Sequence, residues 1–220
     1  MKKLLLAMTA MVALGSPAFA QFDLQVTEVS PFGTDFNNAP DDAVEFIEIT
    51  NFGNTVFQFG IDGDLFFDDQ PANADNADPI LGVDTIAAGE SAIFLNIDFD
   101  NDNNTTNDFT PETGAEFFEE QFPTFEGQIG YFNGSGLSSS GADGATLFLT
   151  DVGIDPTAGD IISELGFEEG SQVLGQSFQA PINAFATPTP GFVAAAVPEP
   201  TTAGILTLLS LLAVGKRRRN

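Results

Sequence analysis

Short runs of apolar and β-forming residues, separated by Gly, Asn, Asp and Pro, fill the chain between residues 21 and 192. Apolar and polar residues alternate in residues 22–26, which is the pattern of a half-buried strand. Further strands are predicted at residues 44–49, 55–59, 65–67, 91–96, 128–132 and 145–150. No long stretch has the 3.6-residue apolar spacing of a helix. We therefore predict an all-β domain over residues 21–192, built as an antiparallel sandwich or barrel.

One predicted strand, at residues 44–49, contains a break in this alternation. Phe46 and Ile47 are consecutive apolar residues between Glu45 and Glu48, and such a slip is typical of a β-bulge. A pair of carboxylates could carry out glycoside hydrolysis. In a bulged strand, however, we expect both glutamates to face outward as ordinary surface charges. No catalytic residue is predicted.

The first 20 residues have the order of regions that is typical of a secretory signal peptide. Two lysines precede an apolar stretch at residues 4–14, which is followed by the small-x-small sequence Ala-Phe-Ala at residues 18–20. We predict a signal peptide at residues 1–20, cleavage before Gln21 and export of the protein.

The chain ends with an apolar stretch and a cluster of positive charge. Residues 203–214 are apolar but number only 12, against about 20 residues in an ordinary transmembrane helix. The basic residues that follow are Lys216, Arg217, Arg218 and Arg219. By the positive-inside tendency this cluster stays in the cytoplasm and stops translocation. We predict that residues 201–220 insert transiently into the inner membrane rather than form a durable anchor.

A proline-rich linker at residues 193–200 precedes this tail, and it ends in Pro198, Glu199 and Pro200. The Pro-Glu-Pro motif, the short apolar segment and the terminal arginines resemble, in that order, the PEP-CTERM sorting signal of Gram-negative bacteria. The resemblance implies that a membrane enzyme of the exosortase type removes the tail. It also implies a place at the cell surface or in the extracellular matrix, and an association with exopolysaccharide and biofilm. A plain tail anchor is the alternative.

The distribution of charge excludes several classes of function. All six Lys and Arg residues lie in the first three or last five positions, whereas the chain contains 32 Asp and Glu and no His, Cys or Trp. Without positive charge the domain cannot neutralise phosphates, which excludes nucleic acid as a partner. Without His or Cys it has no Ser-His or Cys-His nucleophile and no imidazole or thiolate zinc site. All acidic residues except Glu199 precede the tail, so the exported domain needs a hydrated, cation-rich setting.

Several predicted strands and turns follow one another in the order of a known family. The segments concerned are residues 26–29, 45–51, 56–60, 86–90, 92–95, 144–149, 175–177 and 189–191. Together they resemble a lamin-tail-type domain, although residues 98–140 depart from it. The resemblance implies an immunoglobulin-like antiparallel β-sandwich with no enzymatic activity of its own. A generic acidic β-sandwich of another family is the alternative.

Oxygen-bearing side chains recur along residues 98–108. The candidate ligands for Ca²⁺ are Asp98, Asp100, Asp102, Asn104 and Asp108. Oxygen ligands at every second position can converge on a cation when a loop curls around it, and Ca²⁺ takes six to eight of them. The segment is not an EF-hand, because Asn103 stands at the position of the Gly and Phe109 at that of the bidentate Glu. A calcium site and a solvated acidic loop both fit the sequence.

These features predict an exported, non-enzymatic protein of the cell surface or extracellular matrix of a Gram-negative bacterium. Its expected partners are an exosortase-type enzyme and either extracellular polysaccharide or a matrix protein. The alternative is a secreted calcium-dependent carbohydrate-binding module or a carboxylate glycosidase. The lack of Trp and the single Tyr131 weaken this alternative, because sugars commonly stack on such rings.

A calcium site in the Asp-rich segment predicts that millimolar Ca²⁺ raises the melting temperature well beyond NaCl at matched ionic strength. A ligand at about 100 times its dissociation constant stabilises the folded state by about 2.7 kcal/mol, which a thermal melt detects. Replacing Asp100 and Asp102 by Asn should remove the calcium increment and leave the NaCl response. Equal responses of the wild type to the two salts would identify a solvated loop.

Overall fold

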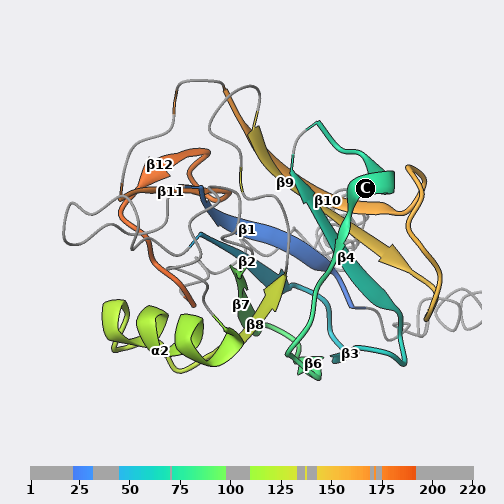
Figure 1. Cartoon of the computed structure of the whole chain (residues 1–220), viewed down its shortest axis with the longest axis horizontal. Helices are drawn as coiled ribbons and strands as arrows, with labels where there is room; N and C mark the ends of the chain where they lie inside the picture. Colours follow the sequence, from blue (N-terminus) through green and yellow to red (C-terminus); the bar gives the residue numbers. More distant parts are fainter. Residues whose placement is uncertain are drawn as a thin grey trace, which may run out of the picture.

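The computed structural model describes residues 22–31, 45–69, 71–97, 110–132, 137, 143–168, 171 and 175–191 (Figure 1). The strands are β1 (Leu24–Ser30), β2 (Phe46–Asn51), β3 (Phe57–Gln58), β4 (Asp64–Asp69), β5 (Asp78–Pro79), β6 (Thr85–Ile86), β7 (Ser91–Asn96), β8 (Gln128–Phe132), β9 (Asp143–Thr150), β10 (Ile161–Phe167), β11 (Ser177–Gln179) and β12 (Ala184–Ala186). The described part also contains an α-helix, α2 (Pro111–Gln121), and a 3-10 turn, η1 (Ala74–Asn76).

These strands form two principal sheets, which confirms the predicted all-β sandwich. The larger sheet has the order β12-β11-β1-β2-β7-β8, the smaller one has the order β10-β9-β4-β5, and β3 pairs separately with β6. All strand pairs are antiparallel except β7 and β8, which run parallel. A parallel pair needs a crossover connection, and the segment that contains α2 provides it.

The two sheets bury a phenylalanine-rich core between them. Ile47 and Phe94 of the six-stranded sheet and Phe67 and Leu147 of the four-stranded sheet belong to this inter-sheet core. The rings of Phe67 and Phe132, one from each sheet, lie 4.4 Å apart between centroids. Aromatic pairs of this kind add about 0.5–1.5 kcal/mol beyond the burial of their area. Packing therefore substitutes for the disulfides that a chain without Cys cannot form.

A second apolar cluster covers the other face of the six-stranded sheet, where α2 packs (Figure 1). Phe46 of β2 and Ile93 and Leu95 of β7 contribute from the sheet, and Phe118 contributes from the helix. The ring of Phe46 lies edge-on to those of Phe118 and Phe122, at centroid distances of 5.4 and 6.1 Å. The central strands are consequently buried on both faces.

The sequence pattern did not predict α2, because the helix is short and buries little of its surface. Only Gly114 and Phe118 are buried, at the four-residue spacing of a single helical face. Its start is nevertheless well specified. Pro111 occupies the first turn, and Thr110 and Thr113 form a reciprocal capping box of side-chain and backbone hydrogen bonds. In the described residues, no helix is long and apolar enough to cross a membrane.

The predicted bulge at Phe46 and Ile47 is wrong. β2 pairs with β7 in unbroken register, and both residues are apolar because Phe46 faces α2 whereas Ile47 faces the inter-sheet core. The register shift lies in β1 instead, where Thr27 is the extra residue between Val26 and Glu28.

Truncating Phe118 should separate α2 from the sheet. We expect Phe118→Ala to lower the free energy of unfolding by about 3 kcal/mol, because it removes a fully buried ring that contacts Phe46. Chemical denaturation monitored by circular dichroism measures the change. The matched control is Glu119→Ala on the exposed side of the same helix, which should stay within about 0.5 kcal/mol of the wild type. Equal effects of the two substitutions would contradict this packing.

Candidate functional site

Two glutamates lie side by side on the face of the six-stranded sheet that is turned away from the inter-sheet core. Glu28 of β1 pairs directly with Glu48 of β2 across the two strands. Their exposed fractions are only 3% and 1%. Glu48 shares its face with Phe46 and Thr50, because residues two apart in a strand point to the same side. The expectation that Glu48 faces solvent is therefore wrong.

Three neighbouring hydroxyl groups form a hydrogen-bonded chain that ends at the Glu48 carboxylate. The Thr27 hydroxyl donates to Glu48 Oε1 at 2.6 Å and lies 3.0 Å from the Thr50 hydroxyl, which in turn lies 2.7 Å from that of Ser91. The backbone N–H of Gly191 donates to Glu48 Oε2 at 2.5 Å. The carboxylate thus joins the sheet to a segment near the end of the described chain.

The Glu28 carboxylate likewise accepts hydrogen bonds from a hydroxyl and a backbone N–H group. The hydroxyl of Ser177 in β11 and the backbone N–H of Thr189, the latter at 3.0 Å, both donate to Glu28 Oε1. The side-chain amide of Gln179 donates to the carbonyl oxygen of Thr187 at 2.9 Å and to the hydroxyl of Thr189 at 3.2 Å. Residues 187–191 are therefore fastened to the sheet mainly by side chains.

Burial makes it costly to ionise this pair. It raises the pKa of Glu28 from 4.5 to about 7, the neighbouring charge of Glu48 adds to the effect, and the hydrogen bond from Ser177 opposes it. Burial also raises the pKa of Glu48, against the hydrogen bonds from Thr27 and Gly191. The Lys and Arg residues of the chain all lie outside the described part, so neutral donors alone compensate these carboxylates there.

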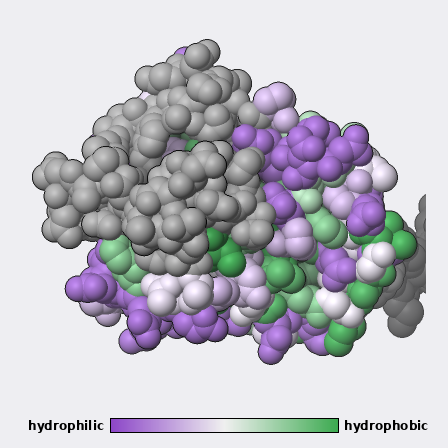
Figure 2. All heavy atoms as spheres, viewed as in Figure 1, coloured by the Kyte–Doolittle hydropathy of each residue, from purple (hydrophilic) through white to green (hydrophobic). Residues whose placement is uncertain are grey.

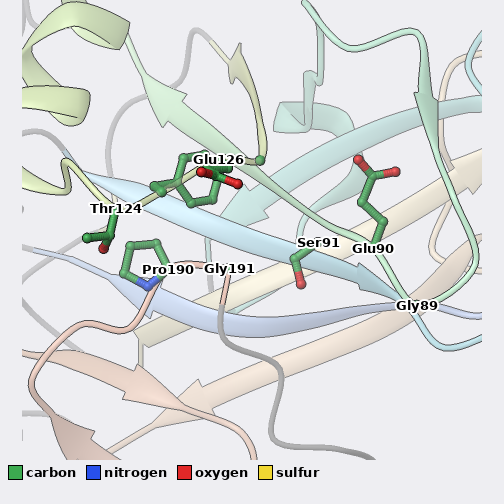
Figure 3. Close-up of a pocket in the computed structure, with 9 residues that line it drawn as sticks. Gly89, Glu90, Ser91, Thr124, Glu126, Pro190 and Gly191 are labelled. Carbon is green, nitrogen blue, oxygen red and sulfur yellow. The ribbon is translucent and has the colours of Figure 1, made fainter.

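A cavity of about 390 Å³ opens beside the pair, between the turn before β7, the loop before β8 and the chain after β12 (Figure 3). Its lining residues are Gly89, Glu90, Ser91, Thr124, Phe125, Glu126, Gly127, Pro190 and Gly191. Figure 3 shows the side chains of Thr124, Glu126 and Pro190 on one side and those of Ser91 and Glu90 on the other. Ser91 and Gly191 belong both to this lining and to the surroundings of Glu48.

The lining favours ligands that donate hydrogen bonds. Glu90 already accepts from Gln128 Nε2 at 2.9 Å and from the backbone N–H of Ala87 at 2.6 Å, which fixes its position. Glu126 and Thr124 are exposed at the rim. With two carboxylates and no cation in its lining, the cavity repels anions and suits neutral or positively charged, hydroxyl-rich molecules.

The structure does not bring Glu45 and Glu48 together as an acid–base pair. Three residues apart, they point to opposite faces of the sheet, and Glu45 Oε2 accepts from Asn96 Nδ2 at 3.1 Å and from the backbone N–H of Leu137 at 2.8 Å. Within the described residues, no group of three or more acidic side chains is placed to hold a metal ion.

The other predicted site residues lie outside the described residues. They are the calcium ligands Asp98, Asp100, Asp102, Asn104 and Asp108, the motif Pro198, Glu199 and Pro200, and the basic residues Lys216, Arg217, Arg218 and Arg219. Sequence reasoning in turn missed the role of Glu28. The available signal was an acidic residue between the β-branched residues Thr27 and Val29 of strand β1.

Comparison with known proteins gives no further assignment of this site. No protein-family model, curated protein or solved structure matches the chain.

Removing the hydroxyl of Thr27 should destabilise the fold in a pH-dependent way. Thr27→Val keeps the shape of the side chain but leaves Glu48 without its 2.6 Å donor, so we expect a loss of about 1–3 kcal/mol in the free energy of unfolding. The loss should be larger at pH 8 than at pH 5, because burial raises the pKa of Glu48, its partner Glu28 has a pKa of about 7, and an ionised carboxylate depends more on a donor than a protonated one. Urea denaturation at both pH values measures it, with Thr124→Val at the exposed rim as control. A loss that is the same at both pH values would contradict a role of the Thr27 hydroxyl in stabilising the ionised carboxylate.

Proposed function

We propose that this chain is an exported, non-enzymatic protein of the bacterial cell surface or extracellular matrix, and that its C-terminal tail sorts it there. The order of three features in the tail carries the proposal: Pro198-Glu199-Pro200, the apolar stretch at residues 203–214 and the basic cluster at residues 216–219. Pro198 follows Gly191, the last described residue of the sandwich, by seven positions. The tail is thus separate in sequence from the folded domain.

The chemistry of the domain supports a role in binding or display rather than catalysis. Glu28 and Glu48, whose pKa values are raised by burial, are almost fully buried and accept hydrogen bonds from hydroxyl and backbone N–H groups, so they present little surface to a substrate. Hydrophilic side chains make up much of the described surface on the face shown in Figure 2. Since the chain has 32 Asp and Glu and its six Lys and Arg lie only at its two ends, such a domain is strongly acidic, and its charge keeps it dispersed among the counter-ions of a hydrated matrix.

The partners follow from the proposed route. An exosortase-type enzyme recognises the tail while residues 201–220 are held in the inner membrane, and the processed domain then joins a matrix of polysaccharide or protein. The domain between the two ends carries no Lys or Arg, so nucleic acid and polyanionic chains are unsuitable partners in the absence of bridging cations.

The cavity beside Glu48 favours a second candidate function, that of a secreted carbohydrate-binding module. Its carboxylates and hydroxyls accept hydrogen bonds from sugar hydroxyls, and the half-buried ring of Phe125 offers an apolar surface. Calcium dependence would require the segment with Asp98, Asp100 and Asp102. A carboxylate glycosidase is less well supported, because Glu45 and Glu48 face opposite sides of the sheet.

Intact mass spectrometry of protein from the native host tests the sorting proposal. We expect the mature chain to begin at Gln21 and to lack residues 216–220. A variant with Pro198→Ala and Pro200→Ala should keep the tail and remain in the membrane fraction, because the sorting enzyme no longer recognises the motif. The control is Pro188→Ala, which lies before the motif and should be processed normally. A full-length C-terminus on the wild-type surface protein would refute the proposal.

A further inference from the structure

Residues 187–191 lie beyond the last strand of the larger sheet and cover the face that contains the glutamate pair. Three side chains of the sheet reach this segment: Glu28 accepts from the N–H of Thr189, Glu48 accepts from the N–H of Gly191, and Gln179 donates to the carbonyl oxygen of Thr187. The segment also forms the Pro190–Gly191 wall of the cavity.

We propose that Glu28 and Glu48 form a proton-operated clamp that docks residues 187–191 on the sheet and thereby closes one wall of the cavity. The clamp follows from the described residues alone and does not depend on the sorting proposal. Its elements are the direct cross-strand pairing of the two carboxylates, their burial and their separate bonds to two N–H groups of the same segment.

The groups around the pair explain why docking of residues 187–191 depends on protonation of the two glutamates. The elements packed against the pair present neutral donors: Ser177 and Gln179 from β11, Ser91 from β7, and the backbone of residues 187–191. Among the described residues, the ionisable groups that face this region are the two glutamates themselves and, from the cavity side, Glu90 and Glu126. Every one of them is acidic. When both Glu28 and Glu48 are ionised, two adjacent buried charges repel each other without a cation.

The direction of the effect follows from linkage. In the docked state Glu28 has a pKa of about 7, whereas release of the segment exposes it to water and returns its pKa towards 4.5. The docked state therefore binds protons more tightly, so docking is strongest below pH 4.5 and weakens as the pH rises from there to about 7. For one proton the docking equilibrium changes by up to about tenfold per pH unit within that window. The two carboxylates titrate as a coupled pair, so the proton belongs to the pair rather than to one residue.

Opening of the clamp has a structural consequence for the cavity. Release of residues 187–191 removes the wall made by Pro190 and Gly191 and gives water access to Glu48 through the side of Ser91. The open state of the cavity is thus more populated in neutral or alkaline surroundings than in mildly acidic ones.

Hydrogen–deuterium exchange of the full chain in mild detergent tests the clamp. After correction for the intrinsic exchange rate, protection of the Thr189 and Gly191 amides should fall about tenfold or more between pH 5 and pH 8. Amides of the central strand β2 should keep their protection over the same range, which separates local release from global unfolding.

Four variants distinguish a proton clamp from simple docking. Gln resembles a protonated Glu, so Glu28→Gln should reduce the pH dependence, and the double variant Glu28→Gln with Glu48→Gln should abolish it while the segment stays docked at pH 8. Gln179→Ala should lower protection already at pH 5, because it removes the donor to Thr187 and Thr189, and it should not reduce the pH dependence, because the hydrogen bond from Gln179 lowers the pKa of Glu28. Glu164→Gln, on an exposed position of β10, makes the same charge change as Glu28→Gln and should leave the pH dependence intact.

The proposal is overturned if protection of Thr189 and Gly191 in the wild type is the same at pH 5 and pH 8. It is also overturned if the double variant retains the fall of the wild type, because the titrating group then lies elsewhere. Should Glu28→Gln fail to fold, Glu48→Gln alone carries the same comparison.

Discussion

The lack of fixed positive charge between residues 4 and 215 constrains every other feature of this domain. A buried carboxylate in most proteins is paired with Arg or Lys, since an uncompensated charge in the interior costs several kcal/mol. Here Glu28 and Glu48 are compensated by the hydroxyls of Thr27 and Ser177 and by backbone N–H groups. Because these neutral donors offset the effect of burial only in part, burial raises the pKa of both groups.

Acidic side chains also hold the turns together by the same chemistry. The carboxylate of Asp64 accepts from the N–H of Gly153, and that of Asp160 accepts from both the N–H and the hydroxyl of Thr157. Asp68 accepts from the N–H of Asn73, and its burial raises its pKa. A domain that contains many carboxylates and no cationic side chains thus uses its own backbone N–H groups as the positive ends of its polar contacts.

The central strands β2 and β7 depend on coverage of both faces of the larger sheet. One face meets the four-stranded sheet in the inter-sheet core, and the other is divided between α2 at Phe46 and residues 187–191 at Glu48. The apolar half of that outer face is held by aromatic packing, which does not respond to pH. The polar half is held by hydrogen bonds to titratable groups. Packing of α2 on the sheet is therefore independent of pH, whereas docking of residues 187–191 varies with pH.

The alternation of apolar residues predicted much of the fold. Strands β7 and β8 were predicted with the bounds that the structure shows, and β2, β3, β4 and β9 were predicted in place, because short apolar or alternating runs with turn residues on both sides are typical of strands. β10 was missed, since it buries only Leu165 and Phe167, and β11 and β12 are three residues each, too short to show a period. The bulge in β2 and the outward orientation of Glu48 were predicted wrongly, because a continuous strand buried on both faces has the same sequence pattern as a bulged one.

By itself, therefore, the sequence determined the class of fold, the apolar runs that form its core and the absence of cationic partners for its acids. The sequence could not determine which acidic residues become neighbours in the fold. Glu28 lies opposite Glu48 only because the bulge at Thr27 shifts the pairing of β1 by one residue; without it, Thr27 would lie opposite Glu48. The register of a strand depends on the side-chain packing of both its faces and on the segments that cover them. Residues 187–191 lie far along the chain from both glutamates, so only the tertiary structure could bring their N–H groups to these carboxylates.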